Sequence, residues 1–311
     1  MTLNSFTSKM EKSNFYKKQS AYESIKAAKD INEFTIINQL GKGSSGFVRN
    51  AIHIKTGTKV IIKYVVKSLV LRGCWTDINT LAKYKVNLKC NSVNRRFPNE
   101  IAVLQYIYDE LNGNVPDNIT KLITYWEDSF YYYLIFTDTD FDSDLFDYID
   151  KNPNSIMPEN EARTIFKNIL EAIQILHHHN IVHRDIKDEN VLINYRTKEI
   201  QLIDYGSSAF YKKDQKLSNF VGSFLFAAPE IIKGMSYEGP PQDIWSLGIL
   251  LYTMIYKATP FNDYYEILRA KMRFPPGVSK ECQELILWMT NRDISKRPSI
   301  DDVLNHPWLN K

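Results

Sequence analysis

The chain has 311 residues and a mass of 36.3 kDa, which suits a two-lobed or two-domain globular protein better than a single small core. Charged residues make up 24% of the sequence and hydrophobic residues 44%, which is the ordinary composition of a soluble protein. The formal net charge is only +3, so the charge of the whole chain gives no reason to expect a nucleic acid or a membrane as a partner, and we expect neither.

The cysteines and the apolar stretches indicate a reduced compartment and no membrane span. Cys74, Cys90 and Cys282 are odd in number and lack the paired spacing of a metal site. We therefore expect a cytoplasmic protein, with the nucleus as the alternative. The longest apolar stretch, residues 244–257, is too short to cross a bilayer and predicts a buried helix. Residues 1–33 lack the apolar core of a signal peptide and are expected to form a flexible arm.

The first motif along the chain is GKGSSGFVRN, residues 41–50, whose three glycines let a backbone approach a phosphate. Such a loop can open a helix in a dinucleotide-binding unit or form the tip of a β-hairpin over ATP phosphates. After Gly46 the chain shows β-branched residues in alternation around a Thr-Gly turn at 56–57. This pattern predicts two antiparallel strands and favours the hairpin. The glycines alone fit an unliganded hairpin turn equally well.

Residues 34–136 read mostly as strands, interrupted by one helix that is expected to begin at Pro98. That helix carries Glu100 beside an apolar stripe at spacings of three and four. Before it, residues 64–97 form a basic insert. Either this insert is a solvated loop or it is a basic docking surface.

The pattern changes from strand to helix after an acidic connector, residues 137–144. From residue 145 onward helical spacing dominates, and residues 161–179 place apolar side chains on one face. The sequence therefore predicts an α+β protein, with a strand-rich N-lobe at 34–136 and a helix-rich C-lobe at 145–309.

Three stretches in the C-terminal half place polar side chains in loops beside short strands. They are HRDIKDENVLIN (residues 183–194), LIDYGSS (202–208) and FAAPE (226–230). The first packs Asp185, Lys187 and Asn190 into one loop, and the second delivers Asp204 into a glycine turn. Each stretch alone could be an ordinary loop, because Asp and Asn are common in turns. Their occurrence together, in this order, argues against that explanation.

Here the sequence resembles the eukaryotic protein kinase superfamily over residues 34–309. The motifs that carry the resemblance are Gly41, Gly43 and Gly46 with Val48, VIIK ending in Lys63, His183-Arg184-Asp185 with Asn190, Asp204-Tyr205-Gly206, Ala228-Pro229-Glu230, DIWSLG from Asp243, and Arg297. Within the superfamily, HRDIKDEN, FVGSFLFAAPE and YEGPPQDIWSLGILLYT are similar to the catalytic domain of PAS kinases, in the calmodulin-kinase-like branch. The resemblance implies a bilobal fold with a small antiparallel sheet and one helix in the N-lobe and a larger helical C-lobe.

The resemblance implies an enzyme that uses ATP and Mg²⁺ to phosphorylate serine or threonine in protein substrates, acting as a monomer. Lys63 is expected to reach the α and β phosphates, held by an ion pair with Glu100. Asp185 is expected to accept or orient the proton of the substrate hydroxyl, and Lys187 to screen charge on the moving phosphoryl group. The alternative is a pseudokinase scaffold that binds partners without phosphoryl transfer.

Nucleotide and metal ligands also follow from the resemblance. The residues expected to bind ATP are Leu40, Gly41, Gly43, Gly46, Val48, Ile61, Lys63, Thr137, Thr139 and Leu192. Asn190 and Asp204 are expected to bind Mg²⁺ through oxygen atoms. Phe47 is expected to cap the tip of the glycine loop. Ile61 stands where the family usually has alanine, which adds bulk beside the adenine.

Several residues are expected to select the substrate. Lys187, two residues after Asp185, is typical of the serine/threonine type, and Ser223 is expected to bridge toward that aspartate. Glu189 and Asp144 fall where relatives that select upstream arginine carry acids, and the alternative is that both simply face water.

Other residues are expected to regulate or to support the fold. Phosphorylation in the 207–227 loop could pair with Arg184, or that loop could already be ordered. Tyr205 replaces the usual phenylalanine and brings a hydroxyl that needs a partner if buried. Glu230 and Arg297 are expected to form a buried ion pair.

Overall fold

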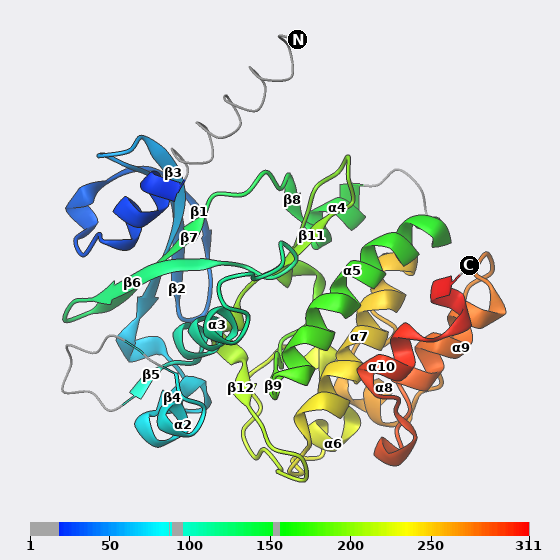
Figure 1. Cartoon of the computed structure of the whole chain (residues 1–311). Coiled ribbons are helices and arrows are strands. Elements are labelled where there is room, and N and C mark those ends of the chain that lie inside the picture. The colour runs from blue at the N-terminus through cyan, green and yellow to red at the C-terminus, as the bar shows by residue number, and fades with distance from the viewer. Residues whose placement is uncertain (1–18, 87, 89–95, 152–155, 311) are drawn as a thin grey trace, which may run out of the picture. The chain divides into compact units, whose positions relative to one another are not determined.

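The computed structural model describes residues 19–86, 88, 96–151 and 156–310 (Figure 1). They divide into two compact units. The first unit runs up to Val70 and adds Lys121–Thr139, and the second holds Leu71–Thr120 and the chain from Asp140 onward. The first is built on an antiparallel sheet and the second mainly on helices, which confirms the α+β class. The segment 71–120 groups with the second unit, whereas the sequence placed it in the N-lobe.

The first unit contains a five-stranded antiparallel sheet of order β1-β2-β3-β7-β6. Its strands are β1 (Phe34–Lys42), β2 (Gly46–His53), β3 (Thr58–Val66), β6 (Leu122–Glu127) and β7 (Tyr131–Thr137). The pairing of β2 with β3 confirms the predicted hairpin, and its turn uses Gly57 at a φ of 69°. Strand alternation buries Ile62 on the core face and sends Ile61 and Lys63 to the opposite face.

Residues 19–33 are ordered, which corrects the expectation of a flexible arm reaching to residue 33. The chain is helical over residues 19–26. Ile25 and Ala28 are 1% and 2% exposed and belong to the core of the sheet. Their spacing of three places both side chains toward the sheet, where burial of apolar surface stabilises the segment. Residues 1–18 of the expected arm lie outside the described residues.

The basic insert from Leu71 onward and the helix after it open the second unit. β4 (Trp75–Asp77) pairs with β5 (Arg96–Pro98), and α2 (Ile78–Lys83) follows β4. The predicted helix is present as α3 (Asn99–Glu110), which begins one residue later than the predicted start at Pro98 and buries an apolar stripe. The described part of the insert is thus folded secondary structure and is not a solvated loop. Residues 87 and 89–95 lie outside the description.

Two cations of the insert lie over aromatic rings. The guanidinium of Arg96 is 4.6 Å from the ring centroid of Trp75, and the ammonium of Lys83 is 4.7 Å from that of Tyr84. Contacts of this kind contribute about 0.5–1 kcal/mol at exposed sites. These two cations therefore take part in local packing.

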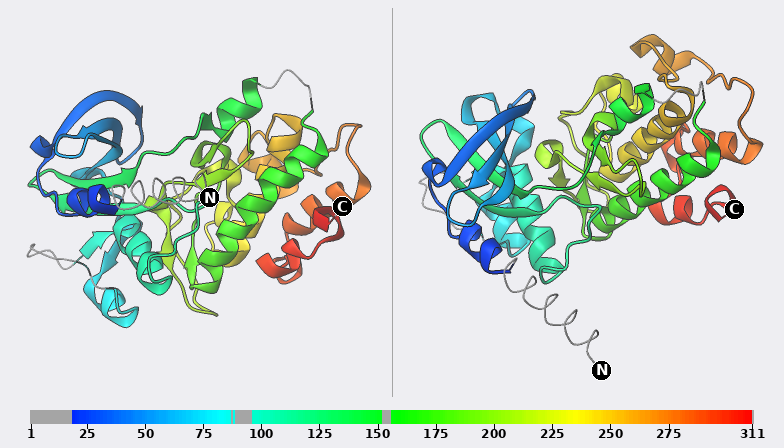
Figure 2. Two further views of the ribbon diagram at one scale, coloured as in Figure 1. Left: turned by 45° about the horizontal axis from the view of Figure 1, so that its top comes forward. Right: turned by 90° about the horizontal axis from the view of Figure 1, so that it is seen from above.

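Seven further helices among the described residues build the larger part of the second unit. They are α4 (Leu145–Lys151), α5 (Glu159–His178), α6 (Pro229–Ile232), α7 (Gly239–Tyr256), α8 (Tyr264–Arg269), α9 (Lys280–Met289) and α10 (Ile300–Leu304). Short 3-10 turns join them, among them η3 (Arg72–Cys74), η4 (Asp188–Asn190), η5 (Tyr205–Ser207), η6 (Phe224–Phe226) and η8 (Pro307–Asn310). α7 is buried along most of its length, as predicted for the apolar stretch 244–257. In both views of Figure 2 the green helix α5 runs beside the red C-terminal turns α10 and η8.

Short strand pairs position the loops that carry the polar motifs. β8 (Ser143–Asp144), β10 (Val191–Ile193) and β11 (Ile200–Leu202) form one small sheet, and β9 (Ile181–Val182) pairs with β12 (Ala209–Phe210). β9 and β10 flank the HRD loop, and β11 and β12 flank the Asp-Tyr-Gly turn. Within the described ranges, none of the helices has the length and apolar character needed to cross a membrane.

Candidate active site

The loop at residues 183–190 is anchored by the buried carboxylate of Asp243 in α7. Oδ2 of Asp243 accepts a hydrogen bond from the backbone N–H of His183 at 2.9 Å, and Oδ1 accepts one from that of Arg184 at 2.8 Å. Nε2 of His177 in α5 lies 3.0 Å from Oδ2. Asp243 is fully buried, so its carboxylate depends on these partners to offset the loss of water.

The carboxylate of Asp185 is held on both oxygens. Oδ1 accepts hydrogen bonds from the backbone N–H of Ser223 at 2.8 Å and from its hydroxyl at 2.9 Å. Oδ2 accepts one from Nδ2 of Asn190 at 3.1 Å, and the same nitrogen donates to the backbone carbonyl of Asp185 at 2.8 Å. The expected bridge from Ser223 to Asp185 is confirmed. These contacts fix the orientation of the aspartate. A side chain that takes part in proton transfer must be held in the geometry that the reaction needs.

Asn190 and Asp204 are brought together by the pairing of β10 with β11. Val191 pairs with Leu202, and the backbone N–H of Ile203 donates to the carbonyl of Asn190 at 3.0 Å. Asp204 then adopts a left-handed backbone, with φ 59° and ψ 76°, and accepts a hydrogen bond from the N–H of Gly206 at 3.3 Å. Asp tolerates this conformation better than most residues, and strained backbone of this kind occurs preferentially at functional sites.

The donor set of Asn190 and Asp204 fits Mg²⁺. The amide nitrogen of Asn190 is used toward Asp185, so its oxygen is the atom that remains as a metal ligand. Mg²⁺ is usually held by one or two protein oxygens together with water and phosphate oxygens. No cluster of three or more His, Cys, Asp or Glu side chains suited to a metal occurs among the described residues.

Glu100 is buried in α3, a helix that contacts the turn η5. Burial and the charge of Glu100 together raise the pKa of the Tyr205 hydroxyl, so this phenol stays protonated. The hydroxyl has no hydrogen-bond partner among the described residues. The described residues therefore do not supply the hydrogen-bond partner that the buried Tyr205 hydroxyl needs. A buried hydroxyl without a partner lowers the stability of the fold by about 1–3 kcal/mol.

The ring of Tyr205 packs edge to face on His183, with centroids 5.1 Å apart. Nδ1 of His183 likewise has no partner among the described residues. Burial lowers the pKa of His183, against the raising effect of nearby carboxylates such as Asp243. The contact therefore joins two uncharged rings.

The three glycines of the motif at residues 41–46 differ in their surroundings: Gly41 lies near the end of β1, Gly43 lies between the strands and Gly46 begins β2. A Cβ on Gly46 would lie 1.7 Å from the backbone oxygen of Tyr64, so glycine is required there for β2 to pair with β3. A Cβ on Gly41 or Gly43 would meet no atom within 4 Å among the described residues. The protein fold itself therefore gives no steric reason for these two glycines, which fits a loop that leaves room for a phosphate.

Phe47 does not cap the tip of this loop as expected. Its ring stacks on Tyr64 with centroids 4.5 Å apart, and the guanidinium of Arg49 lies 4.9 Å from the Phe47 ring. Tyr131 approaches the same ring edge-on. Phe47 belongs to an aromatic cluster on the sheet, because stacking there buries more apolar surface than an exposed loop tip offers.

The residues expected to bind ATP fall in both units. Leu40, Gly41, Gly43, Gly46, Val48, Ile61, Lys63, Thr137 and Thr139 lie in the first unit, and Leu192 lies in β10 of the second. Val48 pairs directly with Lys63, and Ile61 is two residues away along β3, so their side chains share one face. Glu100 lies in the second unit, and its ion pair with Lys63 stays a prediction.

Arg184 holds the start of the 207–227 loop to the basic insert. Its guanidinium donates to the carbonyls of Ser207 and Ser208 and, at 3.0 Å, to that of Gly73 in η3. These carbonyls accept hydrogen bonds from guanidinium N–H groups of Arg184 that were expected to pair with a phosphate. The contact with Gly73 was not predicted from the sequence, because 111 residues separate the two positions.

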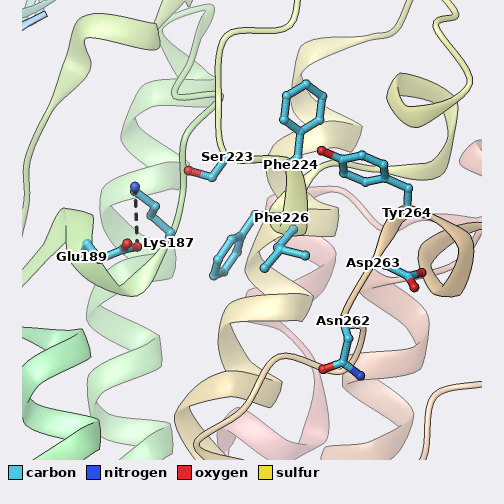
Figure 3. A pocket seen from close by; sticks show the side chains of 9 residues that line it. Lys187, Glu189, Ser223, Phe224, Phe226, Asn262, Asp263 and Tyr264 are labelled. Carbon is cyan, nitrogen blue, oxygen red and sulfur yellow. Dashed lines mark ion pairs between the residues drawn. The ribbon is translucent and has the colours of Figure 1, made fainter. Parts of the chain in front are cut away.

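A cavity of about 360 Å³ lies beside the loop at residues 183–190 (Figure 3). It is lined by Lys187, Glu189, Ser223, Phe224, Leu225, Phe226, Asn262, Asp263 and Tyr264. The rings of Phe224 and Tyr264 are 5.5 Å apart and both are about half exposed. The cavity has an apolar wall and two carboxylates, and Ser223, the partner of Asp185, also lines it. The residues at 262–264 were not singled out from the sequence, since no motif marks them.

Two acids of the loop lie side by side near this cavity. Burial and the charge of Glu189 raise the pKa of Asp188 to about 6. Glu189 lies 3.6 Å from the ammonium of Lys187, and half of its side chain is exposed. Asp144, the other acid expected to select substrates, accepts a hydrogen bond from the N–H of Asp147 at 2.8 Å at the start of α4. Glu189 is therefore open to a ligand, whereas Asp144 also supports a helix.

The expected ion pair of Glu230 and Arg297 is confirmed. The two guanidinium nitrogens of Arg297 donate to the two carboxylate oxygens of Glu230 at 2.6 and 2.7 Å. Arg297 also donates to the carbonyls of Asn291 and Pro241. A bidentate pair with further partners satisfies both buried charges.

Comparison with known proteins agrees with this geometry. The family described as "Protein kinase domain" matches residues 34–309. The chain is 39% identical to serine/threonine-protein kinase PSK2 of Saccharomyces cerevisiae, over 92% of this chain and 24% of that protein. It is 35% identical to serine/threonine-protein kinase pim-2 of Danio rerio, over 89% of this chain and 84% of that protein.

A mouse protein named PAS domain-containing serine/threonine-protein kinase is 30% identical over 89% of this chain and 18% of its own length. The chain thus spans about a quarter of PSK2 and less of the mouse protein. These matches confirm the resemblance to PAS kinases and to the calmodulin-kinase-like branch. The chain belongs to the protein kinase family.

Proposed function

We propose that this chain transfers the γ-phosphoryl group of ATP to serine and threonine hydroxyls of protein substrates, with Mg²⁺ as the metal. The observation that carries the proposal is the carboxylate of Asp185, which is fixed on one oxygen by Ser223 and on the other by Asn190. Membership of the family implies ATP as the donor, and the relatives are named serine/threonine kinases. No finding favours the scaffold alternative.

Phosphoryl transfer needs positioning and charge neutralisation more than covalent chemistry. Asp185 would receive or orient the proton of the incoming hydroxyl. Lys187 would screen the γ-phosphoryl charge, and Lys63, paired with Glu100, would hold the α and β phosphates. Bound Mg²⁺ neutralises phosphate charge, and Asn190 and Asp204 would hold it.

The nucleotide site would combine the open glycine loop with the shared face of β2 and β3. Gly41 and Gly43 leave space for phosphate oxygens, and Val48 with Ile61 would contact the adenine. Leu40, Gly46, Thr137, Thr139 and Leu192 complete the proposed ATP set. We further propose a cytoplasmic monomer, with the nucleus as the alternative location.

We propose a preference for basic residues upstream of the phosphoacceptor, based mainly on Glu189. Its half-exposed carboxylate lines the cavity beside Ser223. A peptide array would test this preference. Equal phosphorylation of serine peptides with and without upstream arginine would remove it.

Phosphate incorporation from labelled ATP tests the proposed activity. Asp185→Asn removes the carboxylate, and we expect a loss of about 100-fold or more, the usual contribution of a positioned base. Asp301→Asn, which changes an exposed carboxylate, is the matched control and should retain activity. Equal incorporation by wild type and Asp185→Asn, or incorporation by neither, would end the proposal in favour of a scaffold.

A further inference from the structure

The loop at residues 223–228 is tied to α7 by the buried side chain of Gln242. Oε1 of Gln242 accepts a hydrogen bond from the backbone N–H of Ala228 at 2.8 Å, and Nε2 donates to the carbonyl of Phe226 at 3.1 Å. Nε2 also donates to the hydroxyl of Ser246 at 2.9 Å, and that hydroxyl donates to the same Phe226 carbonyl at 2.8 Å. Gln242 is 0% exposed and Ser246 is 1% exposed.

These side chains satisfy backbone groups that secondary structure leaves open. The loop passes from η6 to α6, and among the described residues the hydrogen-bond partners of the Ala228 N–H and the Phe226 carbonyl are side chains of α7. A buried backbone group without a partner costs about 1–3 kcal/mol. Gln242 uses its acceptor and both of its donors for this small network, so an apolar residue of similar size could not replace it.

The same loop carries two parts of the proposed site. Its first residue, Ser223, donates twice to Asp185. Phe224, Leu225 and Phe226 form the apolar wall of the cavity (Figure 3). Gln242 is not among the residues that line the cavity, and it reaches the site only through the backbone of this loop.

The neighbouring residue in α7, Asp243, anchors the catalytic loop in the same manner, through two backbone N–H groups. The start of α7 is itself held close to β9, because a Cβ on Gly239 would lie 2.6 Å from Cγ1 of Val182. Two consecutive side chains of one firmly packed helical turn therefore set the positions of the two loops that meet at Asp185.

We propose that Gln242 is a positioning residue for the protein substrate: it fixes the backbone of residues 223–228 so that the wall of the cavity and Ser223 are in register with Asp185. This inference rests on the proposed kinase activity. It predicts that loss of the Gln242 hydrogen bonds weakens productive binding of the peptide and leaves the binding of ATP as it is.

Steady-state kinetics with the serine peptide that wild type phosphorylates best, and with ATP, test the proposal. For Gln242→Leu we expect kcat/KM for the peptide to fall about tenfold or more, chiefly through KM, because the Ala228 N–H loses its partner and the Phe226 carbonyl keeps only the Ser246 hydroxyl. KM for ATP and the slow hydrolysis of ATP without peptide should stay within about twofold of wild type. Ser246→Ala, which leaves Gln242 in place, should show a smaller effect of the same kind.

Thr253→Val is the matched control, since Thr253 is also buried in α7 and its hydroxyl donates to the carbonyl of Ile249 in its own helix. It should leave the peptide KM unchanged. If Gln242→Leu does not fold, the same kinetics are measured on Gln242→Glu, which keeps the acceptor for the Ala228 N–H and removes the donor to the Phe226 carbonyl. An unchanged peptide KM in the folded variants, or equal losses for peptide and ATP, overturns the inference. Inactivity of the wild-type chain would instead overturn the proposed function.

Discussion

In the loop at residues 183–190, the proposed catalytic loop, the backbone N–H groups of His183 and Arg184 and both carboxylate oxygens of Asp185 have hydrogen-bond partners. In the glycine loop, by contrast, a Cβ on Gly41 or Gly43 would meet nothing within 4 Å among the described residues. The first region is held by buried polar contacts, whereas the second leaves open space beside two of its glycines. A group that moves a proton must be held in place, whereas a loop that covers phosphates must leave space for them.

The strongest test of this comparison is to remove the anchor of the catalytic loop. Asp243→Asn replaces one carboxylate oxygen by an amide that cannot accept from His183 or Arg184. We expect the free energy of unfolding to fall by about 3 kcal/mol or more, because a buried charge-assisted contact is broken. Urea denaturation measures the loss, and phosphate incorporation should fall with it. If Asp243→Asn is as stable as the exposed control Asp301→Asn, the loop is not anchored in this way.

An intermediate effect is expected within the glycine loop itself. Gly46→Ala should lower the free energy of unfolding by about 2 kcal/mol, since its Cβ would clash with the Tyr64 backbone. Gly43→Ala should change stability by less than about 0.5 kcal/mol and should raise KM for ATP. Thermal unfolding and ATP kinetics of the two variants measure this. Equal destabilisation by both substitutions would show that Gly43 has no more space for a side chain than Gly46.

The smallest expected effect concerns the exception within the well-paired region, the Tyr205 hydroxyl. Tyr205→Phe removes a buried group that lacks a partner among the described residues and keeps the ring on His183. We expect stability to rise by about 1 kcal/mol, measured as a higher melting temperature, with kinase activity retained. A lower melting temperature would mean that the Tyr205 hydroxyl does have a hydrogen-bond partner, so that it would be no exception in this region.

The sequence predicted those features that local pattern or motif order determines. The β2–β3 hairpin follows from alternation around Gly57, and the helix after Pro98 follows from apolar spacing. The contact of Ser223 with Asp185 follows from the family motif, as does the Glu230–Arg297 pair.

Features that depend on packing between distant segments were missed. The sequence did not reveal that Gln242 binds the backbone of residues 226 and 228, or that Arg184 binds the carbonyl of Gly73, because backbone groups carry no sequence signature. Phe47 was assigned to the loop tip, although its ring packs on Tyr64. Gly46 was read as a phosphate contact, and only the distance to the neighbouring strand shows that pairing requires it.

The adjacency of Gln242 and Asp243 has an evolutionary consequence. With about 3.6 residues per turn, consecutive side chains point about 100° apart, so one helix can serve two separate loops only while its rotation is fixed. A single-residue insertion or deletion at the start of α7 would withdraw both side chains at once. Substitutions in this turn should therefore be accepted in descendants only together with compensating changes in both loops.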